Sequence, residues 1–129
     1  MSDIKNSNSI IAQKCYSFSL NIISSYKKLI ADKREYVLSK QLLRSGTSIG
    51  ANVNEALSAE SKKDFIHKLS IALKEAKETS YWLNLLKDSE YLDHAVFFSL
   101  NNNCLEIIRI LSSIIITTKK RYLNKNVNS

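Results

Sequence analysis

Apolar residues recur three and four positions apart along four segments of the chain, and short charged runs separate these segments. This spacing places side chains on one face of an α-helix. The pattern predicts helices over about residues 9–31, 36–58, 61–87 and 91–120. The four apolar stripes consist of Ile11, Cys15, Phe18, Ile22, Tyr26 and Leu29; Leu38, Leu42, Ser45, Ile49, Val53 and Ala56; Phe65, Leu69, Ala72, Ala76, Thr79, Leu83 and Leu86; and Phe97, Cys104, Ile108, Leu111, Ile115 and Thr118.

The connections between the predicted helices are short, so consecutive helices run antiparallel. The predicted fold class is all-α, an up-down-up-down antiparallel four-helix bundle. The run from Ser61 to Asp64 resembles a capping box with Asp in place of Glu. The third stripe extends over about three heptads, which predicts packing at a crossing angle of about 20°. We expect a disordered segment over residues 1–8, the bundle over 9–122 and a flexible basic tail over 123–129.

Length and composition exclude several classes of protein. The 129 residues fit one domain, and with no proline and only two glycines they cannot supply the turns of a β-barrel or sandwich. Gly46 and Gly50 form neither a phosphate loop nor a dinucleotide-binding fingerprint, which excludes those nucleotide enzymes. The formal net charge of +7 favours polyanionic partners, with nucleic acid as the first candidate.

The two cysteines form no metal-binding or CxxC motif. In the expected bundle Cys15 lies level with about Ile114, roughly ten residues or about 15 Å from Cys104, which is too far for a disulfide. Both are predicted to be small core residues. The stretch from Met1 to Ser9 lacks the apolar core of a signal peptide, and no segment has the roughly 20 apolar residues of a membrane span. We expect a cytoplasmic protein.

Titratable residues indicate no catalytic centre. His67 and His94 belong to different predicted helices, near opposite ends of the bundle, and neither follows a glutamate by three residues as in a di-iron bundle. Asp64 precedes His67 by three residues but is the predicted capping residue. No nucleophile elbow or cysteine–histidine signature is present. We expect no metal and no cofactor, and a metal-dependent bundle enzyme is the weakest hypothesis.

Small residues dominate the middle of the second predicted helix. Ile49 is the only large side chain from Ser45 to Gly50, and each glycine costs about 1 kcal/mol in a helix interior. We interpret this as a close helix crossing, within one subunit or between subunits. A polar stripe runs beside it, and its members are Arg44, Ser48, Asn52 and Glu55. We interpret that stripe as structural hydrogen bonds, with a ligand pocket as the alternative.

The second and third predicted helices resemble a known family. The matching residues are Gln41, Arg44, Ser48, Ile49, Asn52 and Glu55, followed by Phe65, Leu69, Ala72, Glu78 and Leu83. They resemble the bacterial four-helix bundle proteins encoded in intervening sequences of 23S ribosomal RNA genes, a fold shared by the accessory variability proteins of diversity-generating retroelements. The resemblance covers about residues 10–120. It departs at Ala56, where the family commonly has glycine, and in the first turn, where the family commonly has proline.

This resemblance implies a homo-oligomer, a pentamer in known relatives, with a basic surface proposed to contact nucleic acid. It implies no established enzymatic activity. In the accessory variability branch the partners are a reverse transcriptase and its RNA template. The matching residues of the second helix, together with Gly46, form a structural motif in this interpretation.

Basic residues are predicted to gather at one end of the bundle. They are Lys119, Lys120, Arg121 and Lys125 of the C-terminal segment, with Lys14, Lys62, Lys63 and Lys68 brought near by the antiparallel arrangement. Cations also stabilise a helix C-terminus, which is the alternative explanation of the C-terminal cluster. Aromatic residues beside the stripes, such as Tyr16 and Tyr81, are typical of interfaces and predict self-association.

The leading hypothesis is therefore a non-enzymatic oligomeric bundle that binds RNA or DNA or serves as a scaffold, as an accessory to a reverse transcriptase in one branch of the family. The alternative is a purely structural module that binds only protein, with a positive charge that serves solubility.

Overall fold

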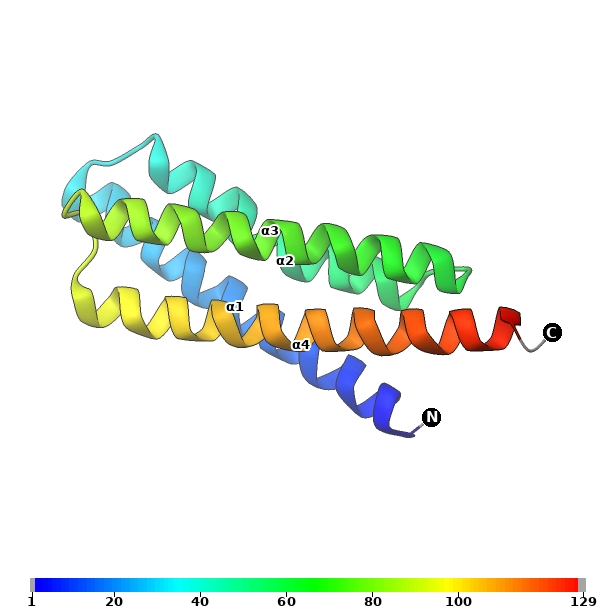
Figure 1. Ribbon diagram of the computed structural model, residues 1–129. Coiled ribbons are helices and arrows are strands. Elements are labelled where there is room, and N and C mark those ends of the chain that lie inside the picture. Colours follow the sequence, from blue (N-terminus) through cyan, green and yellow to red (C-terminus); the bar gives the residue numbers. More distant parts are fainter. Residues whose placement is uncertain (1, 128–129) are drawn as a thin grey trace.

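The chain folds into four helices, α1 (Ser2–Lys33), α2 (Leu38–Leu57), α3 (Lys62–Asp88) and α4 (His94–Val127). The computed structural model describes residues 2–127, with side chains described for residues 8–124. The helices lie along one another as a bundle (Figure 1). α1 packs beside α2, α2 beside α3, α3 beside α4 and α4 beside α1, so the described helices surround one common core. The predicted antiparallel four-helix bundle is confirmed.

The internal helix ends agree closely with the predicted ones, but the outer ends differ. α1 begins at Ser2, inside the segment predicted to be disordered, and α4 continues to Val127, into the predicted tail. Neither segment contains glycine or proline, so nothing interrupts the backbone hydrogen bonds. Met1, Asn128 and Ser129 lie outside the described residues. No helix over residues 2–127 is both long and apolar enough to cross a membrane.

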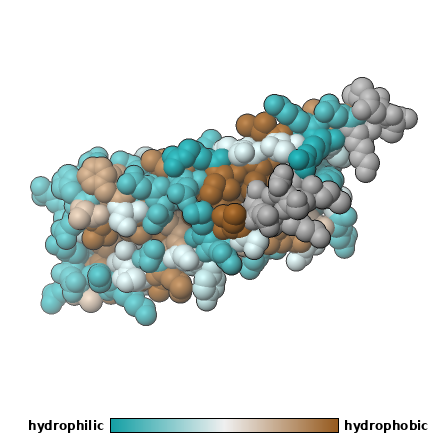
Figure 2. Space-filling model, turned by 90° about the horizontal axis from the view of Figure 1, so that it is seen from below, coloured by the Kyte–Doolittle hydropathy of each residue, from teal (hydrophilic) through white to brown (hydrophobic). Residues whose placement is uncertain are grey.

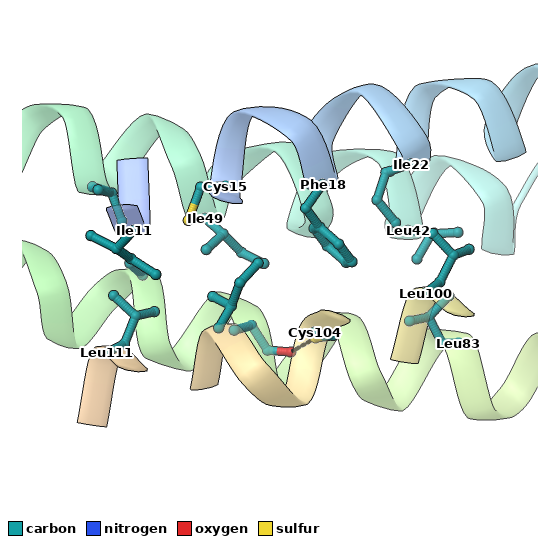
Figure 3. Close-up of a cluster of buried hydrophobic side chains, with 14 of the residues drawn as sticks. Ile11, Cys15, Phe18, Ile22, Leu42, Ile49, Leu83, Leu100, Cys104 and Leu111 are labelled. Atoms are coloured by element: carbon teal, nitrogen blue, oxygen red, sulfur yellow. Dashed lines mark hydrogen bonds between the residues drawn. The ribbon is translucent and has the colours of Figure 1, made fainter. Parts of the chain in front are cut away.

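The predicted stripes form the core. Figure 3 shows side chains from all four helices pointing into a common interior, with Ile11 and Leu111 toward one end of the bundle and Leu42, Leu83 and Leu100 toward the other. The stripe residues are fully buried except for a few that are partly buried, which are Tyr26, Leu38, Phe65 and Ile108. α4 adds further buried residues that the pattern did not single out, which are Leu100, Ile107 and Ile114.

A close crossing of α1 and α2 explains the small residues of α2. A Cβ atom at Gly46 would lie 2.9 Å from both Cγ1 and Cγ2 of Ile22, and one at Gly50 would lie 3.3 Å from Cβ of Cys15. On the α3 side, the Thr79 hydroxyl lies 2.9 Å from that of Ser45 in the buried core. The predicted close approach is therefore confirmed, and it occurs within the subunit.

The axial position of α1 against α4 differs from the predicted one. Lys14 forms an ion pair with Glu106, which places Cys15 near the level of Cys104 and not of Ile114. Figure 3 shows Cys104 between the levels of Cys15 and Phe18, and Leu111 near the level of Ile11. The ion pair shows that the seam between α1 and α4 is displaced by about nine residues from the predicted pairing of Cys15 with Ile114.

Both cysteines have free thiols and belong to the core, as predicted. The thiol of Cys104 donates to the carbonyl oxygen of Ala76 at 3.1 Å. Burial raises the pKa of each thiol to about 12. Because the thiolate is the reactive form, both side chains are unreactive at neutral pH and serve as packing residues.

Candidate nucleic-acid interface

The motif residues of α2 hold α2 against α3. Arg44 forms ion pairs with Glu75, at 3.2 Å, and with Glu78. Its Nε also donates to Oε1 of Gln41 at 3.3 Å. The hydrogen bond to Glu78 raises the pKa of Arg44 above its ordinary value, so the guanidinium stays charged. These contacts join one cation of α2 to two consecutive turns of α3.

The rest of the polar stripe is also engaged within the chain. The Ser48 hydroxyl donates to the carbonyl oxygen of Arg44 at 2.6 Å, and Asn52 Nδ2 donates to the carbonyl oxygen of Ser48 at 2.8 Å. Glu55 pairs with Lys68 of α3 at 3.6 Å. Ile49 is fully buried. These contacts favour the structural interpretation of the stripe over a ligand pocket.

Five exposed cations gather where α3 begins and α4 nears its end. Lys62 and Thr118 line the same groove, which brings the two helices together at this end of the bundle. The cations are Lys62, Lys63, Lys119, Lys120 and Arg121, and they are called the basic end below. Among the side chains of residues 8–124, no ion pair engages any of the five.

The groove at the basic end has a volume of about 410 Å³. It is lined by Asn8, Ala56, Leu57, Ala59, Glu60, Ser61, Lys62, Phe65 and Thr118. Sequence reasoning assigned Phe65 to the core and overlooked its place at the groove. The available signal was position, because Phe65 begins its stripe at the end of the bundle, where fewer neighbours can cover it.

Two of the predicted basic residues, Lys14 and Lys68, do not belong to this cluster. Lys14 pairs with Glu106, thirteen residues before Lys119 on α4, which is about 20 Å along the helix axis. The same contact lowers the pKa of Glu106. Lys68 lies near the cluster but is paired with Glu55. The side chain of Lys125 lies outside the described residues. The displaced seam between α1 and α4 explains the error for Lys14.

The candidate metal residues do not come together. His67 lies near the start of α3 and His94 begins α4, so the two are at opposite ends of the bundle, as predicted. The hydroxyl of Ser61 accepts a hydrogen bond from the backbone N–H of Asp64 at 3.0 Å, which confirms the predicted helix cap. The described residues contain no group of three or more His, Cys, Asp or Glu side chains arranged to hold a metal ion.

Comparison with known proteins agrees with the motif on α2 and α3. Residues 7–113 match the family model of the 23S rRNA-intervening sequence protein. The fold is similar to the crystal structure of a protein of unknown function from the S23 ribosomal protein family of Bacteroides thetaiotaomicron, at 50% identity and a TM-score of 0.84. That likeness covers 84% of this chain and 97% of the other. No match is found among curated proteins. Because the family model spans most of the sequence, the chain belongs to the family of 23S rRNA-intervening sequence proteins.

Proposed function

We propose that this protein is a non-enzymatic oligomeric bundle that binds nucleic acid through its basic end. The observation that carries the proposal is the group of five exposed cations, contributed by two helices and free of ion pairs among the described side chains. The formal net charge of +7 acts in the same direction, because phosphate contacts dominate the affinity of proteins for nucleic acids.

The alternative explanation of the C-terminal cations is weakened by the length of α4. A helix dipole stabilises cations within about the last turn of the helix. α4 ends at Val127, six residues beyond Arg121, so Lys119, Lys120 and Arg121 all precede its last turn. These cations therefore have no capping role that would account for them, which favours a charged partner.

Self-association is part of the proposal. Large apolar side chains lie at the surface, among them Tyr16 at 69%, Phe98 at 57% and Ile116 at 54% exposure. Figure 2 shows such apolar groups in brown on one face of the molecule, beside polar groups in teal. A homo-oligomer, a pentamer by family resemblance, would cover part of this surface and would present several basic ends together. A reverse transcriptase as a further partner would be tested by co-purification.

The test compares two variants with matched loss of charge. In the first, Lys62, Lys63, Lys119 and Lys120 are replaced by Gln. In the second, the control, Lys27, Lys28, Lys33 and Lys40 at the opposite end of the bundle are replaced by Gln. Each variant lowers the formal net charge from +7 to +3. The binding of a labelled structured RNA and of a DNA of the same length is measured by fluorescence anisotropy at several salt concentrations.

We expect the logarithm of the affinity to fall with the logarithm of salt concentration, at a slope of about 0.7–0.9 per phosphate neutralised. In the first variant the magnitude of this slope should decrease by about three, because four cations are lost. Its affinity should fall to a similar extent for nucleic acids of unrelated sequence. The control should retain most of the affinity. Equal losses in both variants would show that net charge alone attracts nucleic acid. Absence of binding by the native protein at low salt would leave the protein-only scaffold as the better explanation.

A further inference from the structure

The groove at the basic end is not shaped for phosphate alone. Its lining includes Leu57, which is 43% exposed, and the partly buried Ala59 and Phe65, which add apolar surface and one aromatic residue. Glu60 also lines it, and a carboxylate repels phosphate. A surface that bound only the phosphate backbone would need cations, and exposed apolar side chains would add nothing to that binding. The lining therefore points to a ligand with a flat, apolar and hydrogen-bonding part as well as a charged part.

Tyr122 adds a second aromatic ring near this groove. Thr118 lines the groove and is buried, and Tyr122 follows it by one helical turn on the same face of α4. Tyr122 is nevertheless 38% exposed, because α4 continues past the start of α3 (Figure 1). Over most of its length this side of α4 faces the core. At its end the same side presents Tyr122 beside the groove, next to Arg121.

We infer that the groove receives an unpaired nucleotide, with the base over its apolar floor and the flanking phosphates on the cations of the basic end. This inference rests on the proposed function and names its substrate class, which is single-stranded nucleic acid. Bases stack on aromatic side chains in such sites, and a carboxylate such as that of Glu60 can accept hydrogen bonds from an exocyclic amino group. In a duplex the base faces are stacked inside and cannot enter a groove.

The volume of the groove agrees with this class of ligand. At about 410 Å³ it falls at the small end of the range for small-molecule pockets, of the order of 300–1,000 Å³. A single nucleotide fits this size, whereas a double helix does not. The phosphates would remain outside the groove, where Lys62, Lys63 and Lys119 are exposed.

The experiment measures the binding of a 12-nucleotide single strand and of the duplex of the same sequence, as RNA and as DNA, with 2-aminopurine in the strand to report stacking. Variants Tyr122→Leu and Phe65→Leu are compared with Tyr36→Leu, which changes a 51% exposed tyrosine just before α2, at the opposite end of the bundle. Circular dichroism establishes that each variant is folded. Because Tyr122 is exposed, its variant tests the inference even if Phe65→Leu disturbs packing.

We expect the single strand to bind more tightly than the duplex and to change its 2-aminopurine fluorescence on binding. Tyr122→Leu and Phe65→Leu should each weaken single-strand binding by about 5- to 150-fold, the range for loss of one base–aromatic stack, with little change for the duplex. Tyr36→Leu should change neither. Equal affinity for strand and duplex, unaltered in Tyr122→Leu, would overturn this inference and leave the proposed function intact. Failure of the native protein to bind either probe would overturn both.

Discussion

Gly46 shows how one missing side chain determines the distance between two helices. Its hypothetical Cβ would meet two branches of Ile22, a β-branched residue whose side chain has little freedom to move. At Gly50 the nearest atom is at 3.3 Å, a contact that a small shift relieves. The two glycines are thus not equivalent, although the sequence presents them alike.

We predict that Gly46→Ala lowers the free energy of unfolding by about 1–2 kcal/mol, because the overlap with Ile22 outweighs the better helix propensity of alanine. Gly46→Leu should cost more. Gly50→Ala should change stability by less than about 0.5 kcal/mol. Urea denaturation followed by circular dichroism measures each value.

A double variant isolates the cause. In an Ile22→Ala background the overlap is removed, and Gly46→Ala should then be neutral or stabilising. If Gly46→Ala stabilises the native protein itself, the position does not require close approach, and the account of the α1–α2 crossing is wrong.

At the scale of elements, Glu35 shows how α2 begins without a cap at the expected position. Val37 is the N-cap residue and provides no side-chain hydrogen bond. Instead, the Glu35 carboxylate accepts from the backbone N–H groups of Val37 at 3.1 Å, Leu38 at 3.0 Å and Ser39 at 2.7 Å. The sequence placed Glu35 in a charged turn, and its spacing from the helix start matches no standard capping motif.

Stability should therefore depend on the charge of Glu35. Burial raises its pKa, but the backbone N–H groups of Leu38, Ser39 and Val37 and the Ser39 side chain together lower it below the ordinary glutamate value. A lowered pKa in the folded state stabilises the fold above the pKa of the unfolded state. This stabilisation is lost as the pH falls from about 5 through the folded-state pKa.

We predict that Glu35→Gln reduces stability at pH 7 and flattens the dependence of stability on pH between about pH 5 and pH 3. Glu35→Ala should cost about 1–2 kcal/mol at pH 7, as for the loss of other helix caps. Glu60→Gln, a change at an exposed residue with no such contacts among those described, serves as the control. Identical pH profiles for Glu35→Gln and the native protein would contradict this role.

The end of α1 contains a strained residue that glycine would relieve. Arg34 has a φ of 53°, in the left-handed region that favours glycine, and the backbone N–H of the next residue, Glu35, donates to the carbonyl oxygen of Leu29 at 3.1 Å. We predict that Arg34→Gly raises the free energy of unfolding by about 0.5–1 kcal/mol. Lys33→Gly, one residue earlier and still helical, should lower it by a similar amount. If both variants lose stability, the backbone of Arg34 is not strained in the way proposed.

The helices were predictable because periodicity reports which face of a helix is buried. It does not report how far one helix slides along another, since every shift by about a turn keeps the same face inward. That is why the prediction that Cys15 faces the core was correct, whereas the prediction that it lies level with Ile114 of α4 was wrong. The level is marked by the ion pair between Lys14 and Glu106, which the spacing of apolar residues does not reveal.

At the scale of the whole molecule, the same limitation determined which cations of the basic end could be predicted to lie together. The start of α3 and the end of α4 meet because antiparallel neighbours must meet at their ends, so Lys62 and Lys119 were predictable as neighbours. Lys14 was not, because its level depends on the displaced seam. The groove between Lys62 and Thr118 was beyond sequence analysis, since its lining combines residues of all four helices with the connection between α2 and α3.

Self-association and nucleic-acid binding should respond to salt in different ways. Contacts between apolar side chains such as Phe98 and Ile116 do not weaken when charges are screened, whereas phosphate contacts do. We predict a solution mass that is a multiple of 14.7 kDa at micromolar concentration, unchanged between about 0.1 and 0.5 M salt, over which affinity for nucleic acid falls steeply. Light scattering measures the mass at each salt concentration.

The four-residue Gln variant at the basic end distinguishes the two properties within one chain. Its cations lie at the end of the bundle, while the exposed apolar residues Tyr16 and Phe98 lie along its sides and toward the other end. The variant should therefore keep the oligomeric mass of the native protein while it loses affinity for nucleic acid. If its mass fell to that of one chain, the basic end would belong to the subunit interface. A native mass of 14.7 kDa would instead show that the exposed apolar surface supports no assembly of this chain.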